Sequence, residues 1–108
     1  MINATIIRNS LEQVVGCIIK GHSRDIVCAS ASMLMTNTAN CIEKLTNLAE
    51  SDYECVYNKD GGYFRLILGD VAESNHDARL LMSALHLGLA SIGQYYPNDF
   101  KLKEKKAK

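Results

Sequence analysis

The sequence has 108 residues, 47% of them hydrophobic, and twelve basic side chains balance twelve acidic ones. This length and composition predict one globular domain with a buried core rather than a disordered chain. The net charge of zero argues against direct nucleic-acid binding, and no apolar run approaches the ~20 residues of a transmembrane helix. Because the first residues also lack the basic and apolar parts of a signal peptide, we expect a cytoplasmic protein without a membrane partner.

The first half of the chain predicts a hairpin followed by a long helix. Apolar residues at every second position from Ile2 predict a strand, which the turn residues 8–10 end. A β-branched run predicts a return strand over residues 12–20, in which Gly16 marks a bulge or a close backbone approach. Apolar residues then recur at helical spacing, which predicts a helix over residues 26–50.

The second half repeats the pattern of hairpin and helix. Strands are predicted over residues 53–57 and 63–68, and the glycine pair at 61–62 can supply positive φ in the turn between them. Ser74 begins a capping-box pattern with the aspartate three residues later. We expect the second helix to start there and to end near Tyr95, before a proline.

The C-terminal residues predict a last, short element. Phe100 and Leu102 fit an edge strand, and the lysine-rich residues after them are expected to form a solvated tail. We expect one α/β domain over residues 1–100, with the edge strand and tail in residues 101–108. The element order ββαββαβ predicts an α/β fold of the two-layer α+β type, a mainly antiparallel sheet of four to five strands with two helices on one face.

Three residues that could do chemistry, His22, Asp25 and Cys28, lie where the second strand gives way to the first long helix. Asp25 is a candidate N-cap, which would make Cys28 the third helical residue. Unpaired N–H groups and the positive end of the helix favour a thiolate there, and the thiolate is the nucleophilic form. His22 could fold back across the short connection and share a proton with Cys28, as in nucleophilic catalysis.

Two further features belong to this candidate site. The N–H groups of Cys28 and Ala29 are expected to face the oxyanion that forms when a thiolate attacks a carbonyl. Gly21 has no Cβ, so a substrate backbone could approach the histidine closely. The same residues also fit a purely structural interpretation, in which the cysteine is a small buried hydrophobe and the histidine a surface residue.

The other cysteines, Cys17, Cys41 and Cys55, fall in predicted strands or on the apolar stripe of the first helix. We interpret them as packing residues, which leaves Cys28 as the exception by position. No Cys-x-x-Cys pairing occurs in the sequence, so neither a zinc knuckle nor a thioredoxin-type motif is present. We expect neither a metal nor a cofactor.

Three segments carry a family resemblance. The first is Gly21-His22 followed, after a short gap, by residues 25–32, Asp-Ile-Val-Cys-Ala-Ser-Ala-Ser. The second is Gly61-Gly62-Tyr63 after a charged turn, and the third is the late segment 80–89 with Tyr96-Pro97. Together they resemble the ribosomal-processing cysteine proteases, the Prp or YsxB-like family, over nearly the whole chain.

The resemblance implies a cysteine endopeptidase in which Cys28 is the nucleophile and His22 its partner. It places Asp25 and Ser32 at other positions that the family keeps in the active-site region. The implied substrate is the N-terminal extension of the bacterial large-subunit ribosomal protein twenty-seven, and family members are typically homodimers. Many members carry a longer, glycine-containing loop between the histidine and the aspartate, whereas only residues 23–24 lie there in this chain.

A second class of function fits the same features. A non-catalytic, ribosome-associated module could hold a peptide or RNA in the same cleft or on the lysine-rich tail. Preferential alkylation of Cys28 together with cleavage of an extension peptide would favour the protease over this module.

Overall fold

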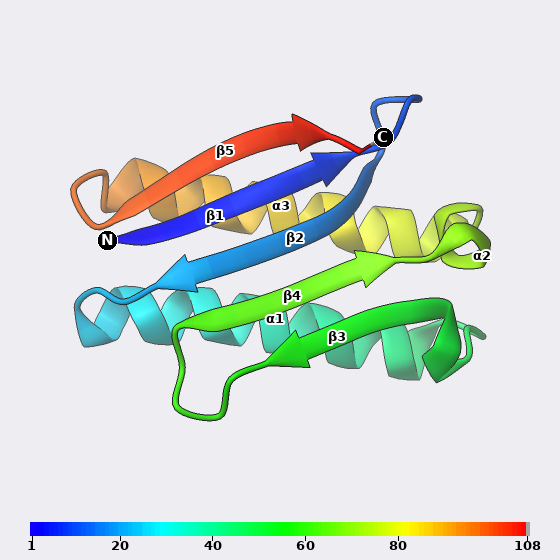
Figure 1. The fold of residues 1–108 in the computed structure, drawn as a ribbon, viewed down its shortest axis with the longest axis horizontal. Helices are drawn as coiled ribbons and strands as arrows, with labels where there is room; N and C mark the ends of the chain where they lie inside the picture. The colour runs from blue at the N-terminus through cyan, green and yellow to red at the C-terminus, as the bar shows by residue number, and fades with distance from the viewer. Residues whose placement is uncertain (108) are drawn as a thin grey trace.

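The fold is one five-stranded sheet covered on one face by two long helices (Figure 1). The computed structural model describes residues 1–107. The strands are β1 (Ile2–Arg8), β2 (Val14–Gly21), β3 (Tyr53–Tyr57), β4 (Tyr63–Leu68) and β5 (Phe100–Lys106). The helices are α1 (Asp25–Leu45), the short α2 (Asp70–Glu73) and α3 (His76–Tyr95), with a 3-10 turn, η1, at Glu50–Asp52.

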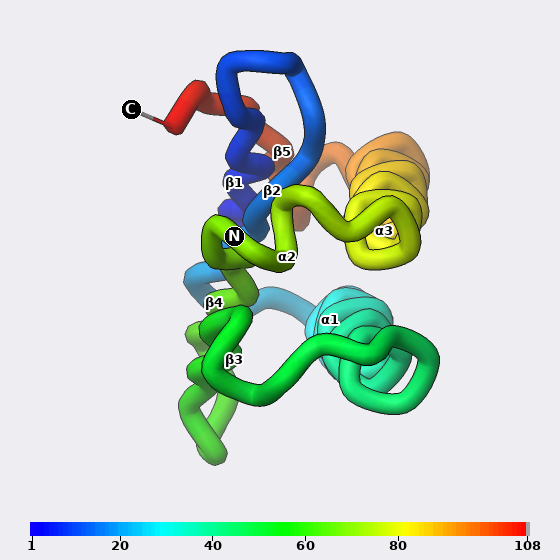
Figure 2. The backbone as a smooth tube through the Cα atoms, turned by 90° about the vertical axis from the view of Figure 1, so that its right-hand side faces the viewer, coloured from blue at the N-terminus to red at the C-terminus, as the bar shows by residue number. Residues whose placement is uncertain are grey.

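The strand order in the sheet is β3-β4-β2-β1-β5. The β1–β5 pair is parallel, and the other three neighbouring pairs are antiparallel. Figure 2, which turns the molecule by 90°, shows α1 and α3 side by side in one layer and the strands in the other. This arrangement confirms the predicted two-layer α+β fold with a mainly antiparallel sheet and two helices on one face.

The core lies between the sheet and the two long helices. Alternate residues of β1, namely Ile2, Ala4 and Ile6, are buried, as a period of two requires when one face of a strand is covered. The helices contribute residues three and four apart, which are Val27, Ala31, Met35, Thr38 and Ile42 of α1 and Ala78, Met82, Leu85, Leu89 and Ile92 of α3. The single apolar stripe on each helix is therefore buried against the sheet.

Helix α1 ends at Leu45, five residues before the predicted boundary at residue 50. Thr46 leaves the helical conformation, with φ −117° and ψ 166°, and its hydroxyl donates to the carbonyl of Ile42. The Asp52 carboxylate then accepts a hydrogen bond from the Ala49 N–H at 2.7 Å, which favours the 3-10 turn η1. Side-chain bonds of this kind compete with the helical pattern, and apolar spacing does not reveal them.

Helix α3 starts one residue later than the capping-box pattern predicts. Asn75, not Ser74, is the N-cap, and its side-chain oxygen accepts from the Ala78 N–H at 2.9 Å. Ser74 instead ends α2, a short helix that the sequence analysis did not predict. The predicted end at Tyr95 is confirmed.

The C-terminal lysine-rich segment is a strand rather than a frayed tail. All seven residues of β5, through Lys106, pair in parallel with β1. Phe100 is buried and Leu102 packs against the core, which anchors the first half of the strand.

Gly16 in β2 also matches its prediction of a bulge or a close backbone approach. A Cβ there would lie 2.7 Å from Cδ1 of Ile67, and the register of the β1–β2 pair shifts one residue away.

Candidate active site

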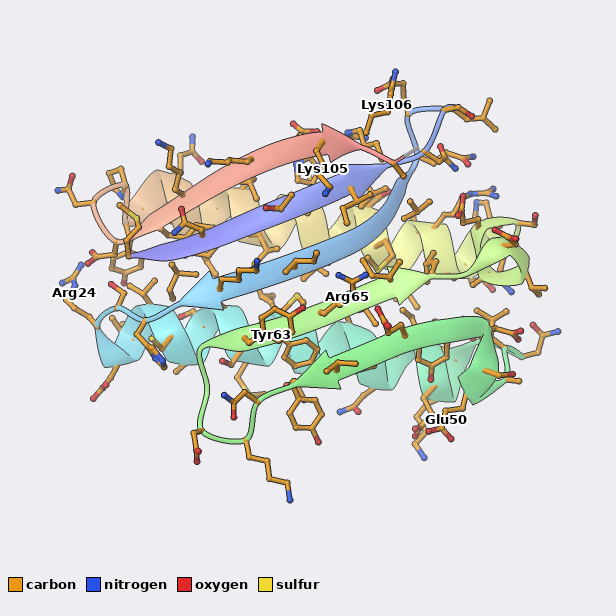
Figure 3. All side chains as sticks on the ribbon, viewed as in Figure 1. Arg24, Glu50, Tyr63, Arg65, Lys105 and Lys106 are labelled. Carbon is orange, nitrogen blue, oxygen red and sulfur yellow. The ribbon has the colours of Figure 1, made fainter. Side chains whose placement is uncertain are left out.

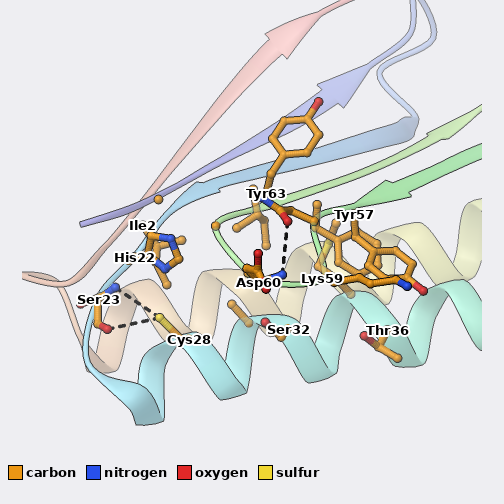
Figure 4. Close-up of a pocket in the computed structure, with 18 of the residues that line it drawn as sticks. Ile2, His22, Ser23, Cys28, Ser32, Thr36, Tyr57, Lys59, Asp60 and Tyr63 are labelled. Carbon is orange, nitrogen blue, oxygen red and sulfur yellow. Dashed lines mark hydrogen bonds between the residues drawn. The ribbon is translucent and has the colours of Figure 1, made fainter.

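A cavity of about 510 Å³ opens where β2 ends and α1 begins (Figure 4). One wall is the β2–α1 connection with the first turns of α1, and the opposite wall is the loop between β3 and β4. Five of the six predicted site residues line this cavity: Gly21, His22, Asp25, Cys28 and Ser32. Ala29 is not among the lining residues, and its side chain is exposed on α1.

The Cys28 sulfur is half-buried and forms hydrogen bonds with the backbone of Ser23. The Ser23 N–H donates to Sγ at 3.2 Å, and the thiol donates to the Ser23 carbonyl oxygen at 3.3 Å. The N–H contact stabilises a negative sulfur, whereas the carbonyl contact requires a protonated one. A thiolate at Cys28 would therefore keep the contact with the N–H and lose the bond to the carbonyl.

The His22 ring lies over the glycine pair of the β3–β4 loop. Gly61 and Gly62 have φ of +83° and +88°, so this loop adopts a conformation that favours glycine. A Cβ on Gly62 would lie only 2.5 Å from Nε2 of His22. The second glycine is thus needed for the position of the imidazole as well as for the turn.

Main-chain bonds fix the residues around His22. The Gly21 N–H donates to the Gly62 carbonyl at 3.0 Å, and the Met1 amino nitrogen donates to the His22 carbonyl at 2.7 Å. Gly21 has a φ of +102°, and a Cβ there would lie 2.3 Å from the Met1 carbonyl oxygen. Close packing against the backbone of Met1 therefore explains this glycine.

Asp99, which precedes β5, ties down the two residues between His22 and α1. Its carboxylate accepts from the Ser23 hydroxyl at 2.9 Å and forms an ion pair with Arg24 at 2.6 Å. These two hydrogen bonds, the Arg24 bond first, hold the pKa of the Asp99 carboxyl below its ordinary value. The Arg24 guanidinium also lies 5.3 Å from the centre of the Tyr96 ring. The short connection is thus held from the side of the molecule that carries the C-terminal strand.

The start of α1 corrects two predictions about the site. Asp25 is the first helical residue, Arg24 is the N-cap, and no side-chain hydrogen bond caps the helix. Cys28 is consequently the fourth helical residue, and its N–H already donates to the Arg24 carbonyl at 3.0 Å. The Cys28 N–H is therefore not free for an oxyanion, and Ala29 lies one residue deeper in the helix.

The remaining cysteines differ in exposure. Cys17 is fully buried, which raises the pKa of its thiol to about 12, and this confirms its packing role. Cys41 is half-buried. Cys55 is exposed on β3, so its interpretation as a packing residue is wrong, although partial desolvation still raises the pKa of its thiol.

Two residues of this site were not identified from the sequence. Asp99 reaches Ser23 across 76 residues of chain, and no local pattern marks it. Gly62 was recognised as a turn residue and as part of a family motif, but its contact with His22 was not predicted. Within residues 1–107, no group of three or more His, Cys, Asp or Glu side chains could hold a metal ion, and no helix is long and apolar enough to cross a membrane.

Comparison with known proteins gives consistent results. Residues 1–101 match the family model of the cysteine protease Prp. The ribosomal processing cysteine protease Prp of Staphylococcus aureus strain Mu50 is 29% identical over 97% of this chain and 100% of its own length.

Solved structures agree in fold. The S. aureus protease Prp with a covalently linked product peptide is 30% identical, with a TM-score of 0.85 over 97% of this chain and 100% of that one. The structure of SMU.848 from Streptococcus mutans is 27% identical, with a TM-score of 0.85 over 99% of this chain and 96% of that one. The family resemblance is therefore confirmed, and this chain belongs to the Prp family of cysteine proteases.

Proposed function

We propose that Cys28 is the nucleophile of this protease and that His22 is its general base. The observation that carries the assignment is that both side chains lie at one end of a single cavity (Figure 4). Asp99 holds the short connection between them, and Gly62 leaves room for the His22 ring. Cys28 is half-buried, unlike Cys17, and so remains accessible to a substrate in the cavity.

The reaction proceeds through an acyl-enzyme. His22 takes the thiol proton as the bond to the Ser23 carbonyl opens, and the sulfur attacks the scissile carbonyl carbon. His22 then gives the proton to the leaving amine. A water molecule, deprotonated by the same imidazole, displaces the sulfur and releases the acid.

The oxyanion is stabilised by N–H groups at the start of α1 rather than by the two predicted earlier. The first residues of a helix have no acceptor one turn before them, and they lie at the positive end of the helix dipole. Asp25 is the first of these residues and also lines the cavity. Although the Cys28 N–H is already hydrogen-bonded, N–H donors for the oxyanion therefore remain available one turn earlier in the helix.

We further propose that the substrate is the N-terminal extension of a ribosomal protein. Relatives of similar sequence are named ribosomal processing proteases, and one S. aureus structure holds a substrate peptide. In this chain the cavity offers apolar contacts from Ile19, Met35 and Phe64 and charged ones from Lys59 and Asp60. Such a mixed lining suits an extended peptide, and this substrate would place the enzyme in the cytoplasm with the ribosome.

Cleavage of a synthetic extension peptide, followed by mass spectrometry, tests the assignment. Cys28→Ser and His22→Gln should both abolish cleavage, and an electrophilic peptide should add covalently to Cys28 alone. Cys41→Ser is the matched control, because Cys41 is also half-buried on α1 but does not line the cavity. Full cleavage by either of the first two variants would disprove the dyad.

We also propose that the chain acts as a homodimer, as the family resemblance implies. Exposed apolar side chains on the solvent side of α3, including Leu80, Leu87 and Tyr95, give the helical layer a surface that a second copy could cover. Sedimentation analysis should show a dimer that Leu87→Asp weakens, whereas a monomer at all concentrations would contradict this proposal.

A further inference from the structure

The uncovered face of the sheet carries most of the positive charge of the strands. We call the side of the sheet opposite α1 and α3 the open face, and its charged residues are Lys20, Glu54, Arg65, Lys101, Lys103 and Lys105. Their placement follows from the register, since Asn3, Thr5 and Ile7 alternate along β1 with Ile2, Ala4 and Ile6, which face the helices. The three lysines of β5 pair directly with those three positions and share their face.

The zero net charge of the chain conceals a separation of charge between its layers. The open face has five basic residues and one acidic residue, Glu54, which already pairs with Arg65. The helices carry the opposite excess, with Asp25, Glu43, Asp70, Glu73 and Asp77 against Lys44 and Arg79. A polyanion is therefore attracted to one side of the molecule, although the whole chain is neutral.

The lysines of β5 are free to bind such a partner. Lys101, Lys103 and Lys105 are exposed, and within residues 1–107 none of them forms an ion pair. They stand at alternate positions of one strand and so form a regular row about 7 Å apart. In Figure 3, which looks onto this face, Lys105 and Arg65 lie in front of the sheet.

An aromatic ring belongs to the same surface. Tyr63 pairs with Lys20 across β2 and β4, next to the half-buried side chain of Ile18. Figure 4 shows its ring pointing away from α1 and from Cys28. Tyr63 is half-buried, and a sheet that presents basic side chains beside an aromatic ring is how many proteins hold unpaired bases and their phosphates.

We propose that the open face binds single-stranded nucleic acid, with the β5 lysines on the phosphates and Tyr63 beneath a base. A second copy of the chain fits this face poorly, because a two-fold contact would bring like charges together. An acidic polypeptide matches the lysines but has no base to stack on Tyr63. The β5 lysines separate the proposal from the proteolytic mechanism, because none of them lines the cavity, whereas Tyr63 also forms part of the cavity wall.

Fluorescence anisotropy with labelled oligouridine and oligothymidine of about twelve nucleotides tests the proposal directly. Binding should weaken as salt rises from about 50 to 200 mM, and replacing the three β5 lysines by glutamine should lower the slope of log K against log salt by about 2. Tyr63→Leu should weaken binding about tenfold with an unchanged slope. A preference for the uridine strand would identify RNA as the ligand, and equal binding would indicate recognition of phosphates and bases alone.

A matched pair of single variants provides the control. Lys103→Gln should weaken binding and leave peptide cleavage unchanged, whereas Lys44→Gln, the same change in the helical layer, should affect neither. Three results would overturn the proposal: no binding at about 50 mM salt, equal losses in the two variants, or equally tight binding of poly-L-glutamate. A Lys103→Gln variant that altered the oligomeric state would also overturn it, because the open face would then be an interface between copies.

Discussion

The Ser23 hydroxyl donates to the Asp99 carboxylate at 2.9 Å, while the backbone of the same serine holds the Cys28 sulfur. The Cys28 sulfur is thus connected through one residue to the start of the C-terminal strand. Only two residues lie between His22 and Asp25, so the bond from Ser23 to Asp99, rather than contacts within a longer loop, holds this connection in place. Asp99 is therefore a positioning residue for the cavity rather than a group that contacts substrate.

Replacing Asp99 should lower turnover without removing it. Asp99→Ala releases both Ser23 and Arg24, and displacement of the sulfur by about 1 Å would cost up to a hundredfold in kcat. Asp99→Asn keeps an acceptor for Ser23 and should lose less. Ser23→Ala breaks the hydroxyl bond to Asp99 but keeps the ion pair with Arg24, so its loss of kcat should lie between those of wild type and Asp99→Ala. Wild-type kcat in Asp99→Ala would show that Asp99 has no positioning role.

The same carboxylate makes a pH-dependent contribution to stability. The pKa of Asp99 is lowered in the folded protein by Arg24 first and then by Ser23, so the folded state binds a proton less readily than the unfolded chain. The stabilisation is therefore present above the unfolded pKa of an aspartate and is lost as the pH falls through the lower, folded pKa. The difference in Tm between wild type and Asp99→Asn should be constant near neutral pH and shrink in acid. A difference that stayed constant down to acidic pH would contradict this linkage.

The adjacent glycines of the β3–β4 loop offer a matched test of the histidine position. Alanine at Gly61 or Gly62 meets the same unfavourable positive φ, which costs about 1–2 kcal/mol in either case. Only at Gly62 would the new Cβ also collide with Nε2 of His22, whereas at Gly61 the histidine is 3.7 Å away. Gly62→Ala should therefore lose about a hundredfold in kcat beyond the loss in Gly61→Ala. Equal kcat values in two variants of equal stability would show that the ring does not depend on Gly62.

The cap of α3 can be tested in the same way. Asn75→Ala removes the bond to the Ala78 N–H and should lower the free energy of unfolding by about 1 kcal/mol. If Ser74 were the cap, Ser74→Ala would be the more destabilising change. Because Asn75 is the cap, the free energy of unfolding of Ser74→Ala should stay within about 0.5 kcal/mol of wild type. Urea denaturation of both variants measures the difference, and the reverse order would restore the capping box that the sequence suggested.

The sequence predicted those parts of the fold that depend on local periodicity. Val27, Ala31 and Ile42 recur at helical spacing because one side of α1 is covered, and a strand such as β1 alternates for the same reason. The cavity residues were found because His22, Asp25 and Cys28 are close in sequence and resemble a family motif. Both kinds of signal come from residues that are near one another in the sequence.

The features that were missed depend on contacts between distant segments. Arg24 rather than Asp25 occupies the N-cap position of α1, in a connection that Asp99, 75 residues away, holds through an ion pair. The C-terminal lysines looked like a solvated tail because their charges dominate the composition, yet every one of the β5 residues finds a partner on β1. Pairing with a neighbouring strand thus outweighed a local preference for disorder, and no inspection of the segment alone could show this.

Thiol labelling tests whether the surroundings of Cys28 make it more reactive than the other cysteines. Cys28 should react with dilute iodoacetamide at neutral pH faster than Cys55, although Cys55 is the more exposed of the two. The reason is that the Ser23 N–H donates to the Cys28 sulfur and stabilises a negative charge there, whereas desolvation raises the pKa of Cys55. Cys55 labelling should accelerate as the pH rises, and Cys17 should stay unlabelled until the protein unfolds, since its pKa is raised to about 12. Mass spectrometry of the labelled peptides gives the order of reaction. If Cys55 reacted first, exposure alone would govern reactivity, and the surroundings of Cys28 would have no activating effect.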